Sequence, residues 1–491
     1  MTPTTPGSVF PRLPWLLVSG CLAALVFLIS RDFPFFWDTI QLASKQATHI
    51  YQTGSLILPD RIDSGHPPGF GAYLALWWSV AGRSLWVSHL AMVPWVMLIV
   101  YQLGRLSYRL LPGRWVWLPL FLLVLAEPFL LGQLLLISPD VVLVGAFLLV
   151  FNGILSGRRW PRLIGTLLLA VISTRGMLVG GGLFVTDLLL NGGLMRWIEG
   201  RTLARKDKLL RAGRLLLPYL PGGLIGLLYL ITHFALKGWI GHHPDSPWAP
   251  SFGWAGPAGL VRNGGILIWR LFDFGRIFLW MALPIALISL RRSHRGEWRE
   301  QLTPLIPAGI GFIVFALLIG LTILPFQGLM NARYLLPVVL CFDLLVGLAL
   351  LKLIPTPLLR RISFLAAFLF FATGNFWRYT AATAQSWDST PLHAACYAQD
   401  RAAVAYLDSA GIALDSVATV FPFTGPLDDR YLNGRTDGFG DYYQSPTLPY
   451  LYYSSVTNDY PDEVLDGLFY RGDAVFGINW RGMETEVYRR E

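Results

Sequence analysis

An acidic residue, Asp38, follows a run of aromatic residues in the stretch FPFFWDT, just beyond the first long apolar segment of the chain. A carboxylate in such partly dry surroundings is costly unless a cation, a metal ion or a substrate group faces it. Ionisable residues at a membrane boundary are therefore candidates for function. The alternative interpretation of Asp38 is a solvated acid in a loop, and its sequence context leaves both open.

A histidine, His66, lies in the stretch DSGHPPGF between a glycine and two prolines. Pro67 and Pro68 restrict the backbone before them to extended shapes, so the turn is stiff and holds the imidazole in a fixed direction. A fixed imidazole can bind phosphate or a metal ion, or pass a proton. The other interpretation is an ordinary turn at the start of a helix that happens to contain histidine.

Three further polar residues are expected at the same face of the membrane. Asp140 begins an apolar segment in ISPDVVLVGAF, where it or Ser138 can instead cap a helix. Arg175 lies in the short polar stretch STRG, and Arg333 lies in NARYLLP before another apolar segment. Arginines at such positions either reach along the lipid interface or hold an anionic head group. We expect Arg175 and Arg333 to bind substrate.

The stretch GHHPDSPW contains His242, His243 and Asp245. The alternative is a metal site, but adjacent histidines rarely ligate one ion, so we interpret this stretch as a solvated loop. The three cysteines have no spacing typical of a disulfide framework or a metal site.

The composition predicts a polytopic membrane protein. Of 491 residues, 54% are hydrophobic and 14% are charged, and the mean hydropathy is +0.51. The net charge of +9 does not indicate nucleic-acid binding, because the basic residues lie mostly in short connectors between apolar segments, as in the positive-inside pattern. Residues 381–491 differ, with 7 arginines against 16 acidic residues. We therefore expect a transmembrane domain over 1–380 and a soluble domain over 381–491.

A bilayer core of about 30 Å needs roughly 20 apolar residues per helix. On this basis we expect about 11 crossings, with the N-terminus cytoplasmic and the C-terminal domain extracytoplasmic, in a plasma (inner) membrane. The segment 162–190 has basic residues on both sides, so we expect a hairpin of two short helices with its tip at 173–176. The other expected crossings are 14–30, 84–104, 115–134, 139–156, 215–234, 266–290, 303–325, 334–353 and 363–380.

A large outer loop, 31–83, precedes the second crossing. It contains an amphipathic segment ending at Gly54 and a sixteen-residue apolar segment, PPGFGAYLALWWSVAG, which is short enough to lie in the interface. The C-terminal domain shows two helical and two strand-like patterns. The fold class is thus all-α and polytopic, with interfacial helices in the first outer loop and a small C-terminal α/β domain.

Several motifs together resemble the GT-C superfamily of polyprenyl-phosphate-sugar-dependent glycosyltransferases. They are the acid after the first helix, the basic residue before two prolines, "PD" at the start of the fourth helix, the "TRG" hairpin tip and "ARYLLP", over roughly residues 14–380. The pattern is most similar to aminoarabinose transferases and protein mannosyltransferases. Where many relatives have a second acid this chain has Thr39, and Gly65 and His66 stand where the aminoarabinose enzymes have Glu-Lys, which leaves metal use and donor sugar open.

The resemblance implies an inverting enzyme whose first outer loop forms the active site. Asp38 matches the catalytic acid and Asp140 the second acid, while His66 matches the basic residue before the prolines. Such a transfer needs a base for the acceptor hydroxyl and a cation for the departing phosphate. Asp38 suits the first role; His66, Arg175 and Arg333 suit the second. A divalent metal ion is an optional cofactor, with Asp38 and His66 as candidate ligands.

The expected partners are a polyprenyl-phosphate-sugar donor, a lipid, glycan or protein acceptor, and the bilayer. The alternative is a transporter or flippase for a lipid-linked sugar, in which the same residues would line a pathway. Transporters typically contain internal repeats and polar residues near the bilayer midplane. Here we find no repeat, and the polar residues gather at one face, which favours the enzyme. We also hypothesise that the C-terminal domain gates this face or binds the acceptor.

Overall fold

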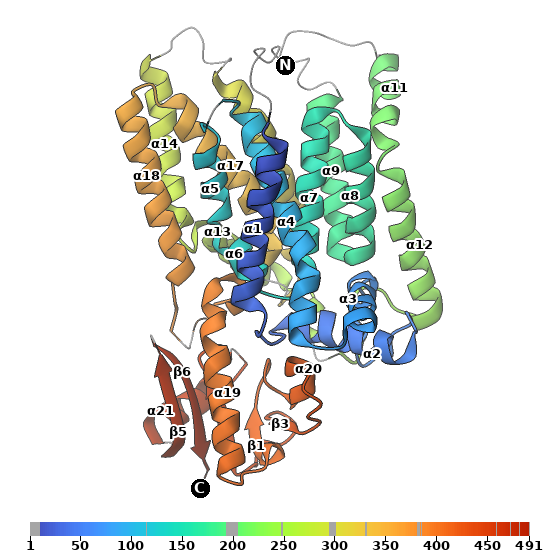
Figure 1. Ribbon diagram of the computed structural model, residues 1–491, viewed down its shortest axis with the longest axis vertical. Coiled ribbons are helices and arrows are strands. Elements are labelled where there is room, and N and C mark those ends of the chain that lie inside the picture. Colours follow the sequence, from blue (N-terminus) through green and yellow to red (C-terminus); the bar gives the residue numbers. More distant parts are fainter. Residues whose placement is uncertain are drawn as a thin grey trace.

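The computed structural model describes residues 10–113, 115–192, 205–246, 249–293, 301–328, 331–380, 383, 385–457, 459–471, 473–480 and 482–490. A long helical bundle forms most of the molecule, and a mixed β-sheet with its helices lies at one end of it, opposite the N-terminal end of α1 (Figure 1). Of the basic connectors expected at 201–214 and 291–300, residues 201–204 and 294–300 lie outside the described residues.

Two helices form the centre of the bundle. In α7 (Pro139–Ser156) and α17 (Leu336–Leu353) most side chains are buried, whereas α12 (Leu220–Lys237) and α18 (Pro357–Ala372) expose apolar side chains along most of their length. Exposed apolar side chains of this kind are suited to contact with lipid. The other helices of the bundle are α1 (Arg12–Ser30), α4 (Leu85–Leu110), α5 (Leu118–Leu125), α6 (Pro128–Leu134), α8 (Arg159–Ile172), α9 (Thr174–Asn191), α11 (Arg205–Leu216), α13 (Gly256–Phe272), α14 (Arg276–Ser293) and α16 (Ile306–Ile323).

The chain is a multi-span membrane protein. Among the described residues, seven helices are long and apolar enough to cross a membrane, and an eighth span results if α13 and α14 count as one. The prediction of about 11 crossings therefore stays a prediction. The single crossing expected at 266–290 is wrong in detail, because α13 and α14 are bent by 75° at the break. Phe274 and Gly275 both have left-handed backbone angles there, which end the first helix.

The segment 115–134 is also interrupted. Helix α5 ends before Glu127, and Pro128 begins α6 without a backbone N–H to continue the helix. Helices α8 and α9 meet at Ser173, whose extended backbone ends one helix and whose hydroxyl caps the next. The break therefore falls at the start of the stretch expected to form the tip of a hairpin.

The first loop folds back on the bundle. A π-helical turn (Ile40–Lys45) leads into α2 (Gln46–Thr53), which ends at Gly54 with a left-handed φ of 70°, and α3 (Gly69–Ala81) follows. Apolar residues of α2 pack against α3. These two helices lie at the same end of the bundle as the β-sheet (Figure 1).

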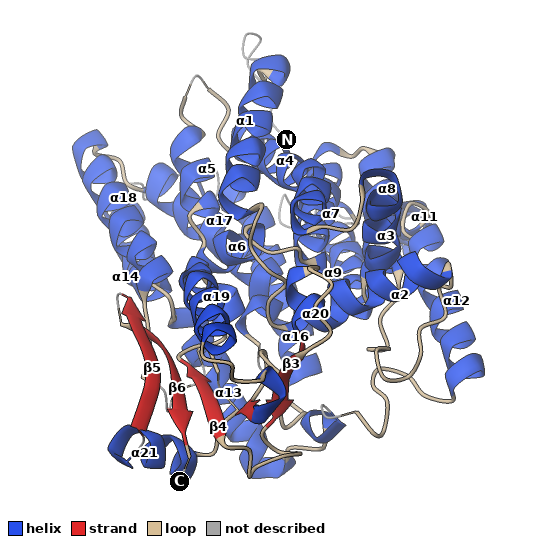
Figure 2. Ribbon diagram, turned by 60° about the horizontal axis from the view of Figure 1, so that its bottom comes forward, coloured by secondary structure: helices blue, strands red, loops and turns tan. Residues whose placement is uncertain are grey.

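The C-terminal region is a six-stranded mixed sheet in the order β2-β3-β1-β4-β6-β5. Strand β1 pairs parallel with β3 and β4, and the other pairs are antiparallel. Helix α19 (Ala394–Ser409) packs on β5 and β6 (Figure 2). The remaining elements are β1 (Val417–Thr419), β2 (Gly425–Pro426), α20 (Leu427–Tyr431), β3 (Gly438–Asp441), β4 (Tyr450–Ser454), α21 (Asp462–Arg471), β5 (Asp473–Trp480) and β6 (Met483–Arg489).

The sheet region is attached to the first loop by packing and charge. Phe36 is buried in the same apolar cluster as Tyr397 of α19. Arg83, after α3, donates two hydrogen bonds to the Asp428 carboxylate, at 3.0 and 2.7 Å. The C-terminal region therefore holds the loop that contains Asp38. The domain boundary near 380 stays a prediction.

Candidate active site

A buried guanidinium, that of Arg333, lies at the centre of the site. It forms ion pairs with three carboxylates, those of Asp38, Asp140 and Asp388. Its side chain is 1% exposed, and a charge so far from water is stable only with close counter-charges. Arg333 therefore joins the first loop, the start of α7 and the C-terminal region at one point.

The backbone around Arg333 is set by its neighbour. Asn331 caps the short turn before α17, where its side-chain oxygen accepts a hydrogen bond from the Arg333 backbone N–H at 3.2 Å. The side-chain amide of Asn331 also donates to Asp388. One residue thus fixes both the position of Arg333 and that of a carboxylate paired with it.

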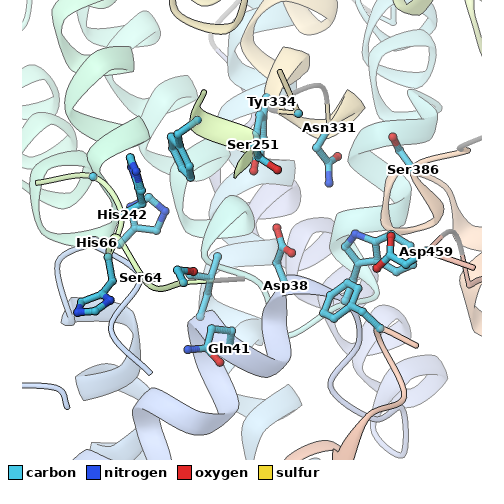
Figure 3. Close-up of a pocket in the computed structure, with 18 of the residues that line it drawn as sticks. Asp38, Gln41, Ser64, His66, His242, Ser251, Asn331, Tyr334, Ser386 and Asp459 are labelled. Carbon is cyan, nitrogen blue, oxygen red and sulfur yellow. The ribbon is translucent and has the colours of Figure 1, made fainter. Parts of the chain in front are cut away.

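Asp38 lies in a tight turn. Trp37 before it has a left-handed φ of 57°, which is unusual for a bulky residue and is associated with functional sites. Thr39 after it accepts a hydrogen bond from the Phe36 N–H at 2.9 Å and donates one to the Phe36 carbonyl at 2.7 Å. The turn directs the Asp38 carboxylate into a cavity (Figure 3), and its side chain is 26% exposed. Asp38 is thus paired on one side and accessible on the other.

Asp140 is not needed as a helix cap. The Ser138 hydroxyl accepts the hydrogen bond from the Asp140 N–H at 3.1 Å and caps α7 itself. The carboxylate of Asp140 is left to pair with Arg175 at 2.8 Å and with Arg333 at 3.3 Å. Arg175, in the first turn of α9, also lies 4.0 Å above the ring of Tyr334. The four residues Asp38, Asp140, Arg175 and Arg333 therefore form one network.

His66 reaches this network through α9. Its Nδ1 and the Thr174 hydroxyl are 2.7 Å apart, a hydrogen-bonding distance. Burial lowers the pKa of His66 to about 4, and Arg175 and Arg333 contribute in the same direction against Asp140. The imidazole is therefore neutral at pH 7, so it serves the site as a neutral hydrogen-bonding group. The cation near it is Arg175.

The turn that contains His66 is fixed in place by contacts with α12 and with the loop that follows it. Asp63 accepts a hydrogen bond from the Gly65 N–H at 2.9 Å and pairs with His233 of α12 at 3.2 Å. Gly65 has φ of 68°, and a Cβ there would lie 2.7 Å from the Gly241 carbonyl oxygen. The stiffness expected from the two prolines is thus reinforced by a second loop.

A cavity of about 470 Å³ opens at this end of the bundle (Figure 3). Asp38 and His66 both line it, so the structure brings the loop carboxylate and the imidazole to one space. His242 and His243, expected in a solvated loop, also line it, and the ring of His242 stacks on Phe252 at 4.1 Å. Arg333 lies beneath Asp38 and is buried.

Asp388 is the site residue that sequence reasoning missed. It is buried, its backbone carbonyl accepts a hydrogen bond from Gln133 at 2.7 Å, and its carboxylate pairs with Arg333. Burial raises the pKa of Asp388 to about 6, against the opposing effect of Arg333 and with smaller contributions from Asp38 and Asp140. In the sequence it is one acid of an acidic region, so no local signal distinguishes it.

The residues found do not fit a metal site. Within the described part of the chain, no group of three histidine, cysteine, aspartate or glutamate side chains is arranged to hold a metal ion. The carboxylates of Asp38, Asp140 and Asp388 converge on the guanidinium of Arg333, which takes the place of a cation between them. The positive charge between these carboxylates is thus a guanidinium and not a metal ion.

The structure is similar to two solved structures of ArnT from Cupriavidus metallidurans. ArnT from Cupriavidus metallidurans bound to undecaprenyl phosphate is 15% identical and aligns over 97% of this chain and 98% of its own, with a TM-score of 0.47. The apo form of the same protein gives 15% identity, 97% of each chain and a TM-score of 0.48. No protein-family model and no curated protein matches the sequence. The function proposed below therefore rests on the residues of this chain.

Proposed function

We propose that the chain is a membrane glycosyltransferase that moves a sugar, with inversion, from a polyprenyl-phosphate donor to an acceptor on the extracytoplasmic side. The observation that carries the proposal is the placement of Asp38. Its carboxylate faces a cavity at one end of a membrane bundle, with a counter-charge behind it and a second arginine and an imidazole beside it. These are the groups that transfer from a lipid phosphate requires.

The reaction is a single displacement. An acceptor hydroxyl gives its proton to Asp38 while its oxygen attacks the anomeric carbon. The bond between that carbon and the phosphate oxygen breaks, and its electron pair leaves with the polyprenyl phosphate. One attack inverts the anomeric centre, and no carboxylate nucleophile is needed.

The phosphate is assigned to the side of the cavity near His66. Arg175 supplies a positive charge there, and it lies in the first turn of α9, where the helix dipole also favours an anion. The neutral His66, which is hydrogen-bonded to Thr174, lines this side of the cavity and supplies a hydrogen-bonding group. Arg333 is enclosed by three carboxylates, so its role is to hold Asp38 and Asp140 in place.

The test uses purified protein in nanodiscs with polyprenyl phosphates that carry radiolabelled sugars and an extract of cell membranes. We expect label to move to an acceptor with release of polyprenyl phosphate. The proposal fails if no donor loses its sugar. If instead an intact donor crosses the bilayer of liposomes that contain the protein, the chain is a transporter.

A further inference from the structure

The cavity has two sides, with Asp38 between them. Figure 3 shows Ser64 and His66 on one side of Asp38, and Ser386 and Asp459 on the other. If the donor phosphate occupies the His66 side, the acceptor must approach Asp38 from the opposite side. We name that side the acceptor lobe and define it by Trp37, Ser386, Phe421 and Asp459.

The acceptor lobe combines aromatic faces with a hydroxyl and a carboxylate. The rings of Trp37 and Phe421 are 5.2 Å apart and nearly perpendicular, which gives an apolar corner directly beside the proposed base. Ser386 adds a hydroxyl to the lining. Aromatic side chains supply large contact areas in ligand sites, and a few polar groups fix the orientation of the ligand. Sugar rings match this lining because they present C–H faces and hydroxyl groups together.

The charge of the acceptor lobe disfavours an anionic acceptor. Among the described residues that line it, three are carboxylates, those of Asp38, Asp63 and Asp459, and Arg270 is the guanidinium. Arg270 is paired with Asp273 at 2.7 Å and is buried. Within the described chain, Asp38 and Asp63 have ion-pair partners, but no ion pair of Asp459 is found. A phosphate entering the acceptor lobe would meet this uncompensated negative charge.

We propose that the acceptor is an uncharged glycan, whose sugar ring lies against Trp37 and Phe421 while its hydroxyl groups donate hydrogen bonds to Asp459. The inference rests on the proposed function and names the acceptor class of that site. Carboxylates accept hydrogen bonds from hydroxyls and repel phosphates, so Asp459 both binds the glycan and rejects phosphorylated forms.

The test is a binding measurement that needs no transfer. Full-length protein in nanodiscs, without donor, is applied to an array that pairs each neutral oligosaccharide with its phosphorylated form and also carries serine and threonine peptides. We expect a neutral member to bind at least roughly tenfold more tightly than its phosphorylated partner, because one repulsive charge pair at close range is worth about that factor. Phe421→Ala should weaken the binding of the neutral oligosaccharide by a similar factor.

Charge reversal provides the second arm. Asp459→Lys should remove or reverse the preference for neutral glycans, whereas Asp466→Lys, at an exposed position of α21 outside the cavity, should leave it unchanged. The inference is overturned if phosphorylated glycans or peptides bind as tightly as neutral glycans, if nothing on the array binds, or if both Phe421→Ala and Asp459→Lys have no effect. Donor cleavage is assayed separately, so cleavage together with a preference for phosphorylated acceptors refutes this inference and leaves the proposed function standing.

Discussion

Replacing Asp38 by asparagine tests the assigned base with the smallest change in shape. The amide keeps the size of the carboxylate and can still accept a hydrogen bond from Arg333, but it cannot take a proton from an acceptor. General-base catalysis contributes about 10²- to 10⁴-fold, so kcat should fall by that factor, which corresponds to a rise of roughly 3 to 5 kcal/mol in the activation free energy.

The protein should still fold. Arg333 keeps Asp140 and Asp388 as ion-pair partners when Asp38 is neutral, so its guanidinium stays compensated. The expected loss of stability is about 1 to 3 kcal/mol, the range for one hydrogen bond to a charged group. Thermal unfolding in nanodiscs and a normal elution profile on size exclusion would show that the variant is intact.

The assay follows release of polyprenyl phosphate from a radiolabelled donor, with KM for the donor measured in parallel. The KM should change by less than about threefold, because a base acts in the chemical step. Asp32→Asn is the matched control, since Asp32 lies six residues earlier, is exposed and pairs with Arg31 at the surface. An asparagine variant that is as active as the control would refute the role of Asp38.

Three further changes probe the surrounding groups. Arg175→Gln should raise the donor KM by roughly tenfold or more and lower kcat less, because it removes the cation assigned to the phosphate. Burial raises the pKa of Asp388 to about 6, so this carboxyl group gains a negative charge as the pH rises through 6. The donor KM should therefore rise between pH 5 and 7, and Asp388→Asn should abolish that rise. Gly65→Ala should destabilise the protein by more than Gly54→Ala, since both have left-handed angles but only Gly65 faces a close contact, with the Gly241 carbonyl.

Matched variants separate these effects from general damage. Arg61→Gln, at an exposed arginine of the first outer loop, is the control for Arg175→Gln. Asp437→Asn, at an exposed acid of the C-terminal region, is the control for Asp388→Asn. A donor KM that Arg175→Gln leaves unchanged would remove that arginine from the phosphate site. A pH dependence of the donor KM that persists in Asp388→Asn would assign the titration to another group. Equal losses of stability in Gly65→Ala and Gly54→Ala would show that the contact with Gly241 has no effect.

The sequence alone indicated those site residues that are polar in otherwise apolar surroundings. Asp38 among aromatics and His66 before two prolines are conspicuous in an apolar chain, and both line one cavity in the structure. Arg175 and Arg333 were placed at this face by the topology of the apolar segments. Local pattern is sufficient in these cases because polarity at a membrane boundary is rare.

The sequence could not reveal what depends on distant partners. Asp388 resembles other acids of its region until the fold places it against Arg333, 55 residues earlier. The bend between α13 and α14 was missed because the apolar pattern continues through it. Interruptions of this kind depend on neighbouring helices that satisfy the freed backbone groups, which a one-dimensional pattern does not contain.

The ion pair between Arg333 and Asp388 sets an order of assembly. When the ribosome has made the first 380 residues, every candidate span has been synthesised, yet Arg333 still lacks one of its three carboxylates. The segment that carries Asp388 must emerge and dock before the three ion pairs of Arg333 are complete. A chain that ends before Asp388 would therefore lack one of the three carboxylates that surround Arg333.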